Sequence, residues 1–147
     1  MIRLRPHHIL DIIRNIGNDR KIAPHEYGHL VHIITQSIIN DINQECILVN
    51  RNDDICGPCI MLNDDKKCLD VLRQLNEPIS KQIYNDDLDN RIFHYLGIKP
   101  DTIITIKAYL YLVKNDLDGI IKICTHPKED IEYRRNGLVL GMKKLGV

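Results

Sequence analysis

Apolar positions, most of them isoleucine, recur at helical spacing near the start of the chain. The first stripe follows Pro6 and ends at Gly17, and its members are Ile9, Ile12, Ile13 and Ile16. Proline suits the first turn of a helix, and apolar residues three and four apart form one face, so the pattern predicts a helix over 6–17. The second stripe is Leu30, Ile33, Ile34, Ile38 and Ile42. It predicts a long helix that starts at Pro24.

The rest of the chain also follows helical spacing, with one exception. The apolar, partly β-branched run 46–49 predicts a strand. Residues 102–106 are rich in β-branched side chains, but the helical spacing after them favours one helix over 100–113. Further helices are predicted over 66–75, from Pro78 to a C-cap at Gly97, over 117–124 and over 131–145. We therefore expect a mainly α fold, a compact helical domain with at most one short strand or hairpin.

Length and charge limit the class of protein and its partners. The chain has 147 residues, the size of one domain, and no repeat or flexible linker divides residues 1–147. Lys+Arg and Asp+Glu both number 20, so a zero net charge offers no attraction for nucleic acid or an anionic membrane surface. No window reaches 18 apolar residues, and no signal peptide is recognised. We expect no nucleic-acid or membrane partner, and a cytoplasmic location that keeps the five cysteines reduced.

Four of the five cysteines are candidate metal ligands. The segment Cys56-Gly57-Pro58-Cys59 puts two thiols on one tight turn, and Cys68 follows at loop distance. Cys124, at the end of a predicted helix, is the candidate fourth ligand. A close pair, a nearby third ligand and a distant fourth are typical of cysteine-rich zinc and iron–sulfur sites. The spacing predicts one metal site that organises the fold, with Cys46 as a core thiol in the predicted strand.

The same four residues, Cys-Gly-Pro-Cys, also suggest a thioredoxin-like dithiol oxidoreductase. In such enzymes the first cysteine is a nucleophile at a helix N-terminus, within a strand-rich core. Here helical patterns dominate both sides of the motif, no tryptophan precedes Cys56, and the polar segment 63–65 interrupts the helix that should follow Cys59. The metal site is therefore favoured, and the dithiol enzyme stays an alternative.

The segment His25-Glu26-Tyr27-Gly28-His29 matches the zinc-protease pattern of two histidines four residues apart with a glutamate base. Pro24 places the segment in a first helical turn, whereas zinc chemistry needs two imidazoles held rigidly in mid-helix. We interpret His25, His29 and His32 as part of a polar helix face.

A second group lies near the N-terminus, where His7, His8 and Asp11 share a turn and a half of the first predicted helix. Asp11 is four residues after His7 and three after His8, so its carboxylate can orient either imidazole or join it at a metal. A satisfied core histidine is the competing interpretation, because this helix is largely apolar. We expect these three residues to line the cofactor site or complete its ligands.

Two blocks of sequence resemble an uncharacterised prokaryotic family, the domain-of-unknown-function family 1284. They are Arg3-Leu4-Arg5-Pro6-His7-His8-Ile9-Leu10 and Asp53-Asp54-Ile55-Cys56-Gly57-Pro58-Cys59, followed by Cys68. The likeness continues through 88–100, 123–124 and 136–138. The resemblance implies a protein that binds an iron–sulfur cluster, with [4Fe–4S] favoured and zinc as the alternative, because both take tetrathiolate sites.

The chain also departs from the family pattern. Asp11 stands where members commonly have a cysteine, and Pro127 and Arg134 replace further cysteines. One site is then left, with Cys56, Cys59, Cys68 and Cys124. Four thiolates imply a structural or electron-transfer role, whereas an open iron position implies substrate or sulfur chemistry. A redox or sulfur-handling protein is the expected partner, and neither enzymatic activity nor a substrate is specified.

Overall fold

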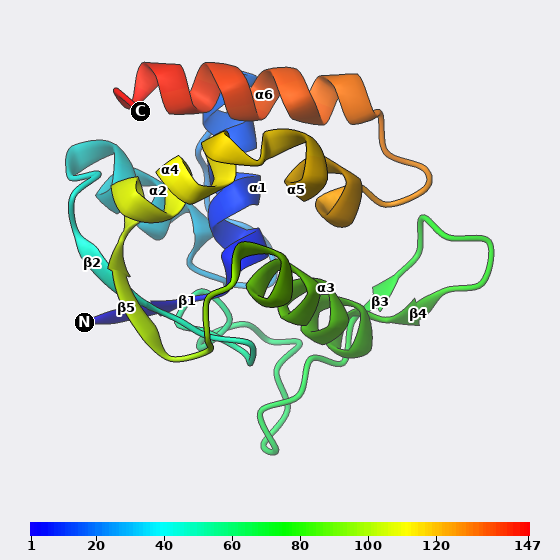
Figure 1. The fold of residues 1–147 in the computed structure, drawn as a ribbon. Helices are drawn as coiled ribbons and strands as arrows, with labels where there is room; N and C mark the ends of the chain where they lie inside the picture. The colour runs from blue at the N-terminus through cyan, green and yellow to red at the C-terminus, as the bar shows by residue number, and fades with distance from the viewer.

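Six helices and two small sheets make up the computed structural model, which describes residues 1–147 (Figure 1). The helices are α1 (Pro6–Gly17), α2 (Val31–Asn40), α3 (Lys81–Leu96), α4 (Ile106–Asn115), α5 (Leu117–Cys124) and α6 (Ile131–Lys144). The strands are β1 (Ile2–Leu4), β2 (Glu45–Leu48), β3 (Val71–Leu72), β4 (Ile79–Ser80) and β5 (Thr102–Thr105).

The larger sheet joins three segments that are far apart in sequence. Its strand order is β1-β2-β5, with β1 parallel and β5 antiparallel to β2. Leu4 pairs with Leu48, so the chain enters α1 beside the point where β2 ends. The loop that follows β2 therefore starts next to the N-terminus of α1, and this loop carries three of the cysteines.

The expected mainly α fold with at most one strand or hairpin is wrong, because the structure is α+β, 48% helical and 12% strand. The predicted helix over 100–113 divides into β5 and α4. Residues 102–105 pair with β2, and the Thr105 hydroxyl then accepts a hydrogen bond from the Ala108 N–H to cap α4. A partner strand thus decided the conformation of the β-branched run.

Two further predicted helices are also corrected. Residues 66–75 form no helix: Lys66 has a φ of 62°, and β3 pairs with β4 instead. The second helix begins at Val31 and not at Pro24, because residues 24–30 turn, with Gly28 at a φ of 75°. The helices predicted over 6–17, 117–124 and 131–145 are confirmed within one residue, and Gly97 is the left-handed C-cap of α3, with a φ of 66°.

An aliphatic core, and not a metal site, is what organises the fold. A cluster of 22 buried residues runs through α1, β2 and α3 to α6, and it includes the Cys46 thiol, as predicted. Helices α1 and α6 cross at glycines, since a Cβ on Gly17 would lie 1.8 Å from the carbonyl oxygen of Gly137. This close crossing fixes the N-terminal helix against the C-terminal one.

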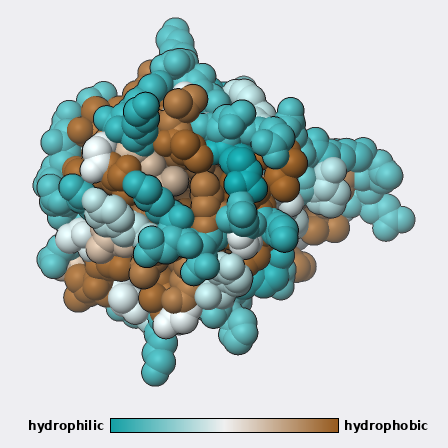
Figure 2. All heavy atoms as spheres, turned by 45° about the horizontal axis from the view of Figure 1, so that its top comes forward, coloured by the Kyte–Doolittle hydropathy of each residue, from teal (hydrophilic) through white to brown (hydrophobic).

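No helix in the structure is long and apolar enough to span a membrane. Apolar and hydrophilic side chains are interspersed over the face that Figure 2 presents. On α6 the exposed large hydrophobic residues are Ile131, Tyr133, Val139 and Leu140.

Candidate functional site

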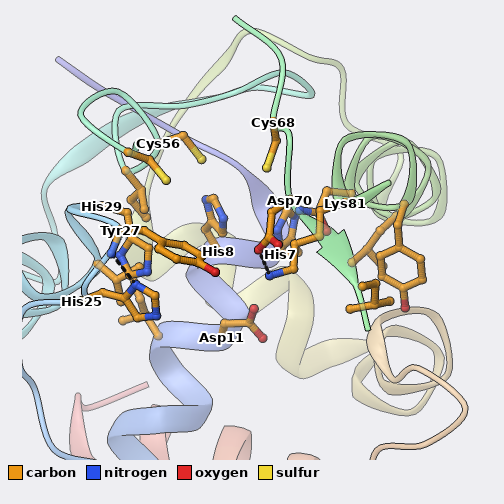
Figure 3. Close-up of a pocket in the computed structure, with 18 of the residues that line it drawn as sticks. His7, His8, Asp11, His25, Tyr27, His29, Cys56, Cys68, Asp70 and Lys81 are labelled. Carbon is orange, nitrogen blue, oxygen red and sulfur yellow. Dashed lines mark hydrogen bonds and ion pairs between the residues drawn. The ribbon is translucent and has the colours of Figure 1, made fainter. Parts of the chain in front are cut away.

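A pocket of about 720 Å³ opens between the first and last helices, the cysteine-bearing loop and α3. All of the predicted site residues line it: His7, His8, Asp11, Cys56, Cys59, Cys68 and Cys124. They do not form a single group. Figure 3 shows Cys56 and Cys68 on one side of the pocket and Asp11 on the other, with His8 between them.

The thiol wall, as we call Cys56, Cys59 and Cys68, is built by the loop after β2. The Cys59 N–H donates to the Cys56 carbonyl at 2.9 Å, which closes the tight turn expected from Gly57 and Pro58. Cys68 is held by its backbone, which pairs with Leu62 and donates to the Gln82 side chain at 2.8 Å. All the cysteines are free thiols, and these three are only partly buried.

Asp53 ties this loop to α1. Its Oδ2 accepts hydrogen bonds from the Arg5 N–H and from His8 Nδ1, both at 2.8 Å, while Oδ1 accepts from the N–H groups of Ile55 and Cys56. Both carboxylate oxygens are thus occupied. One ligand atom each of His8, Asp53 and Cys56 lie within 4.8 Å of one another, but the hydrogen bonds make Asp53 an orienting residue more than a ligand.

The hydrogen bond to Asp53 determines which His8 nitrogen can bind a ligand. With Nδ1 bound to the carboxylate, Nε2 is the ring nitrogen left for the pocket. Burial alone would lower the pKa of His8 and raise that of Asp53. Their mutual attraction outweighs burial, so the pKa of His8 is raised and that of Asp53 falls to about 2. A metal ion at Nε2 therefore has to displace a proton.

His7 is a satisfied core histidine. Its Nδ1 lies 2.9 Å from Asp89 Oδ1, and its backbone N–H donates to the same oxygen at 3.0 Å. Asp89 is fully buried, and its other oxygen accepts from Arg5 at 2.7 Å. Sequence motifs do not single out Arg5, Asp53 and Asp89 as site residues, although all three lie within the segments that resemble family 1284.

The arginine wall, as we call Asp11, Arg14, Cys124, Glu129 and Arg134, is the opposite side of the pocket. Arg134 donates to Asp11 Oδ1 at 2.9 Å, to Glu129 Oε1 at 2.7 Å and to the Cys124 sulfur at 3.7 Å. The predicted fourth ligand, Cys124, is thus grouped with Asp11 and not with the thiol wall. Burial raises the pKa of its thiol to about 11, so it is protonated at neutral pH.

The segment 25–29 does not form the helix that a zinc-protease motif requires. His25 and His29 stack with their ring centroids 4.3 Å apart, and His25 Nδ1 accepts a hydrogen bond from the Tyr27 N–H. A neutral imidazole that accepts at Nδ1 carries its proton on Nε2, so His25 offers a donor to the pocket and no metal-binding lone pair. The expected polar helix face is also corrected, because only His32 lies in a helix.

The dithiol alternative receives little support from the geometry. No helix begins at Cys56 or Cys59, so no helix N-terminus stabilises a thiolate there. Burial instead raises the pKa of Cys56 to about 12, the opposite of what an attacking thiol needs.

Comparison with protein-family models, with curated proteins and with solved structures found no match for this chain. The resemblance to family 1284 therefore stays a prediction.

Proposed function

We propose that this protein binds one iron–sulfur cluster, most simply a [4Fe–4S] cluster, through Cys56, Cys59 and Cys68. The observation that carries the proposal is that three free thiols from one loop line the same pocket, beside an imidazole whose Nε2 is available. Three partly buried thiols at the edge of a large cavity have no role in a hydrophobic core.

The size of the pocket, and the lack of a tight group of three sulfurs, favour a cluster over a single zinc ion. Four thiolates around zinc lie about 2.3 Å from the metal and hence about 3.8 Å from one another. No three cysteine sulfurs in the structure come within 4.8 Å of one another. A cubane holds its thiolates further apart than a single ion does, and the pocket of about 720 Å³ is far larger than one ion needs.

His8 is better placed than Cys124 to supply the fourth ligand. Asp53 holds both the His8 ring and the Cys56 backbone, so the imidazole and the first thiol keep a fixed relation. This is the carboxylate–histidine arrangement that commonly supports a metal ligand. The Cys124 sulfur lies on the arginine wall instead, where Arg134 donates a hydrogen bond to it.

Such a cluster supplies one-electron transfer or, with one iron position exchangeable, sulfur or substrate chemistry. The protein's own residues hold it beside a pocket that extends well beyond the thiols, which favours a redox or sulfur-handling role over a purely structural one. A redox or sulfur-handling partner protein, and a cytoplasmic location that keeps the thiols reduced, belong to the same proposal.

Anaerobic purification followed by iron and sulfide analysis and visible absorption tests the proposal. We expect a brown protein with iron and sulfide, and a large loss of both in Cys68→Ser. Cys46→Ala is the matched control, because Cys46 is buried in β2 away from the pocket, and it should keep its iron. Zinc without sulfide would favour the zinc alternative, and a metal-free protein with a reversible Cys56–Cys59 disulfide would favour the dithiol enzyme.

The fourth ligand is tested separately, by nitrogen hyperfine coupling in the pulsed EPR spectrum of the reduced cluster. A histidine ligand gives a coupling that His8→Cys abolishes while iron is retained. If the coupling is absent and Cys124→Ser loses iron, Cys124 is the ligand and the assignment of His8 is wrong.

A further inference from the structure

Two arginines of the pocket converge on one neutral oxygen. Arg14 donates to Asn15 Oδ1 from Nε at 3.3 Å and from Nη2 at 3.2 Å, and Arg20 donates to the same oxygen from Nη1 at 3.5 Å. All three residues line the pocket. Hydrogen bonds from N–H to oxygen are usually about 2.9–3.0 Å long, so these three contacts are weak ones. The two guanidinium groups are thus held close together around an acceptor that carries no charge, although like charges at short range repel.

Arg20 differs from the other cations of the lining because it has no carboxylate partner. The other ion pairs of the lining are Arg14 and Arg134 with Asp11 and Glu129, and Lys81 and Arg73 with Asp70. For Arg20 the structure shows the long contact with Asn15 and no ion pair. The one lining carboxylate outside these pairs is Glu26, which is exposed to solvent. The lining therefore contains five arginine and lysine side chains against four carboxylates, and the charge of Arg20 is unpaired.

Two histidines of the lining add neutral donors. His25 Nδ1 accepts a hydrogen bond from the Tyr27 N–H at 3.1 Å, and His126 Nδ1 accepts one from the Lys128 N–H at 3.2 Å. A neutral imidazole that accepts at Nδ1 carries its proton on Nε2, so each ring has an N–H donor left for a ligand. Both histidines line the pocket. Donors of this kind, beside an unpaired guanidinium, are the groups that bind an oxyanion.

One face of α1 connects the two arginines to the thiol wall. His8, Asp11, Ile12 and Asn15 have the spacing i, i+3, i+4 and i+7, which places them on one helix face, and all four line the pocket. Figure 3 shows His8 and Asp11 one after the other along this helix. At a rise of about 1.5 Å per residue, Asn15 lies about 10 Å along the helix axis from His8. A ligand whose head is held beside Asn15 can therefore extend past Ile12 toward the imidazole next to the thiol wall.

The space along this face suits an organic body more than an inorganic ion. The pocket has a volume of about 720 Å³, far more than a bare anion fills, and its apolar and aromatic lining includes Ile12, Tyr27 and Val31. Pockets that bind small molecules are typically apolar, with a few polar groups that fix the orientation of the ligand. Here the polar groups at the Asn15 end are the two guanidiniums.

We propose that Arg20 and Arg14 bind the oxyanion head group, a carboxylate or a phosphate, of a small organic anion whose body extends along α1 toward the thiol wall. A guanidinium presents its donors in one plane, an arrangement that matches either head group. The inference deepens the proposed function by naming a substrate class for the cluster pocket. The role of the anion as a substrate rests on that function, whereas its binding needs only the pocket and the arginines.

Binding of four probes with the same six-carbon chain tests this proposal in the purified protein: hexanoate, hexyl phosphate, 1-hexanol and hexylammonium. Ligand-observed NMR is run at neutral pH and about 0.15 M salt, at which long-range attraction between exposed charges is screened. We expect saturable binding of at least one of the two anions, and the tighter of them identifies the head group. Binding of neither anion, or equal binding of 1-hexanol or hexylammonium, would overturn the proposal. Displacement of the anion by inorganic phosphate at similar concentration would also overturn it, because the organic body would then contribute nothing.

Arg20→Gln identifies the position of the head group. The change removes an unpaired charge from an exposed side chain, so the fold is kept, and we expect binding of the anion to weaken about tenfold or more. Arg91→Gln is the matched control, because Arg91 is an exposed arginine of α3 that does not line the pocket, and this variant should bind as the unchanged protein does. Equal binding by Arg20→Gln and the unchanged protein would show that the assignment is wrong. Circular dichroism checks that each variant is folded.

The experiment separates this proposal from the proposed function, because it is run on both iron-loaded and metal-free protein. Selective binding of an organic anion that depends on Arg20 supports the anion site even if no cluster is found. An iron–sulfur protein that binds neither hexanoate nor hexyl phosphate keeps the proposed function and rejects the anion site.

Discussion

Two buried aspartates cap the first helix from a distance. Arg5, the N-cap residue of α1, has no side-chain cap of its own, and its backbone N–H donates to Asp53. The backbone N–H of His7, two residues after Arg5, donates to Asp89. Negative charge at a helix N-terminus is stabilised by the free N–H groups there, so both carboxylates favour the ionised state. The histidines of the first motif are thereby fixed by residues 45 and 82 positions away.

Removing the charge of Asp89 should cost a large part of the protein's stability. Asp89→Asn leaves the buried Arg5 guanidinium with a single carboxylate partner, Asp86, and breaking a buried pair in this way typically costs about 3–5 kcal/mol. Chemical denaturation of the metal-free protein measures the loss. Asp87→Asn, two residues away in an exposed pair with Arg91, should change the free energy of unfolding by less than about 0.5 kcal/mol. Similar losses in the two variants would contradict the role given to Asp89.

The sequence could predict the local part of the site and not the distant part. Cys56 and Cys59 share one turn, so residue types and spacing were enough to group them. Asp53 and Asp89 meet Arg5, His7 and His8 only through the tertiary fold. No local periodicity reports such long-range pairs. The position of Cys124 beside Arg134 is also a long-range contact of this kind, and the spacing of the cysteines does not predict it.

At the scale of elements, the crossing of α1 and α6 depends on the absence of side chains. A Cβ on Gly141 would lie 2.0 Å from the Ile13 carbonyl oxygen, which belongs to the backbone of α1 and cannot rotate away. The helices could not stay at this distance with a larger residue, and the arginine wall draws Asp11 and Arg14 from α1 and Arg134 from α6. The crossing therefore positions that wall.

Gly141→Ala is expected to destabilise the protein, although alanine normally favours a helix over glycine by about 1 kcal/mol. Forcing a methyl group into this packed contact costs about 1–3 kcal/mol, so the sign of the change reports the helix crossing. Thermal unfolding measures it. Asn136→Ala, on the exposed face of the same helix, should raise the melting temperature or leave it unchanged. A more stable Gly141→Ala variant would show that the two helices are further apart than described.

Elements with a strong apolar stripe were predictable, and those determined by a partner were not. Helix α1 buries one continuous face, so its bounds follow from the spacing of its isoleucines. Residues 66–75 carry a similar leucine spacing, but Leu69 is 61% exposed and Val71–Leu72 pairs with Ile79–Ser80 instead. The polar segment 63–65 and the positive φ of Lys66 turn the chain where a helix would have started.

At the scale of the whole molecule, the pocket joins segments from both ends of the chain. The thiol wall belongs to a long loop with little regular structure, and Asp53 and Gln82 connect that loop to α1 and α3. A cofactor that binds three residues of such a loop stabilises the folded state by mass action. The metal-free protein is thus the form in which the stabilising effect of the charged groups themselves can be measured.

Acid should unfold the metal-free protein through its buried aspartates. For Asp89, burial would raise the pKa, but His7 and Arg5 outweigh it and lower the pKa, as Arg134 and Arg14 do for Asp11, to about 2. In the unfolded chain an aspartate titrates near about 3.9, so the stability that these groups contribute is complete above that pH and is lost as the pH falls toward about 2. The raised pKa of His8 also contributes stability. That contribution is complete below the unfolded pKa of about 6.5, so it is constant throughout this acidic range and does not change the slope.

The free energy of unfolding should therefore decrease steadily between about pH 5 and pH 2, and less steeply in Asp89→Asn, where one of the linked groups no longer titrates. Equal slopes in the two proteins would mean that Asp89 is not held ionised by Arg5 and His7.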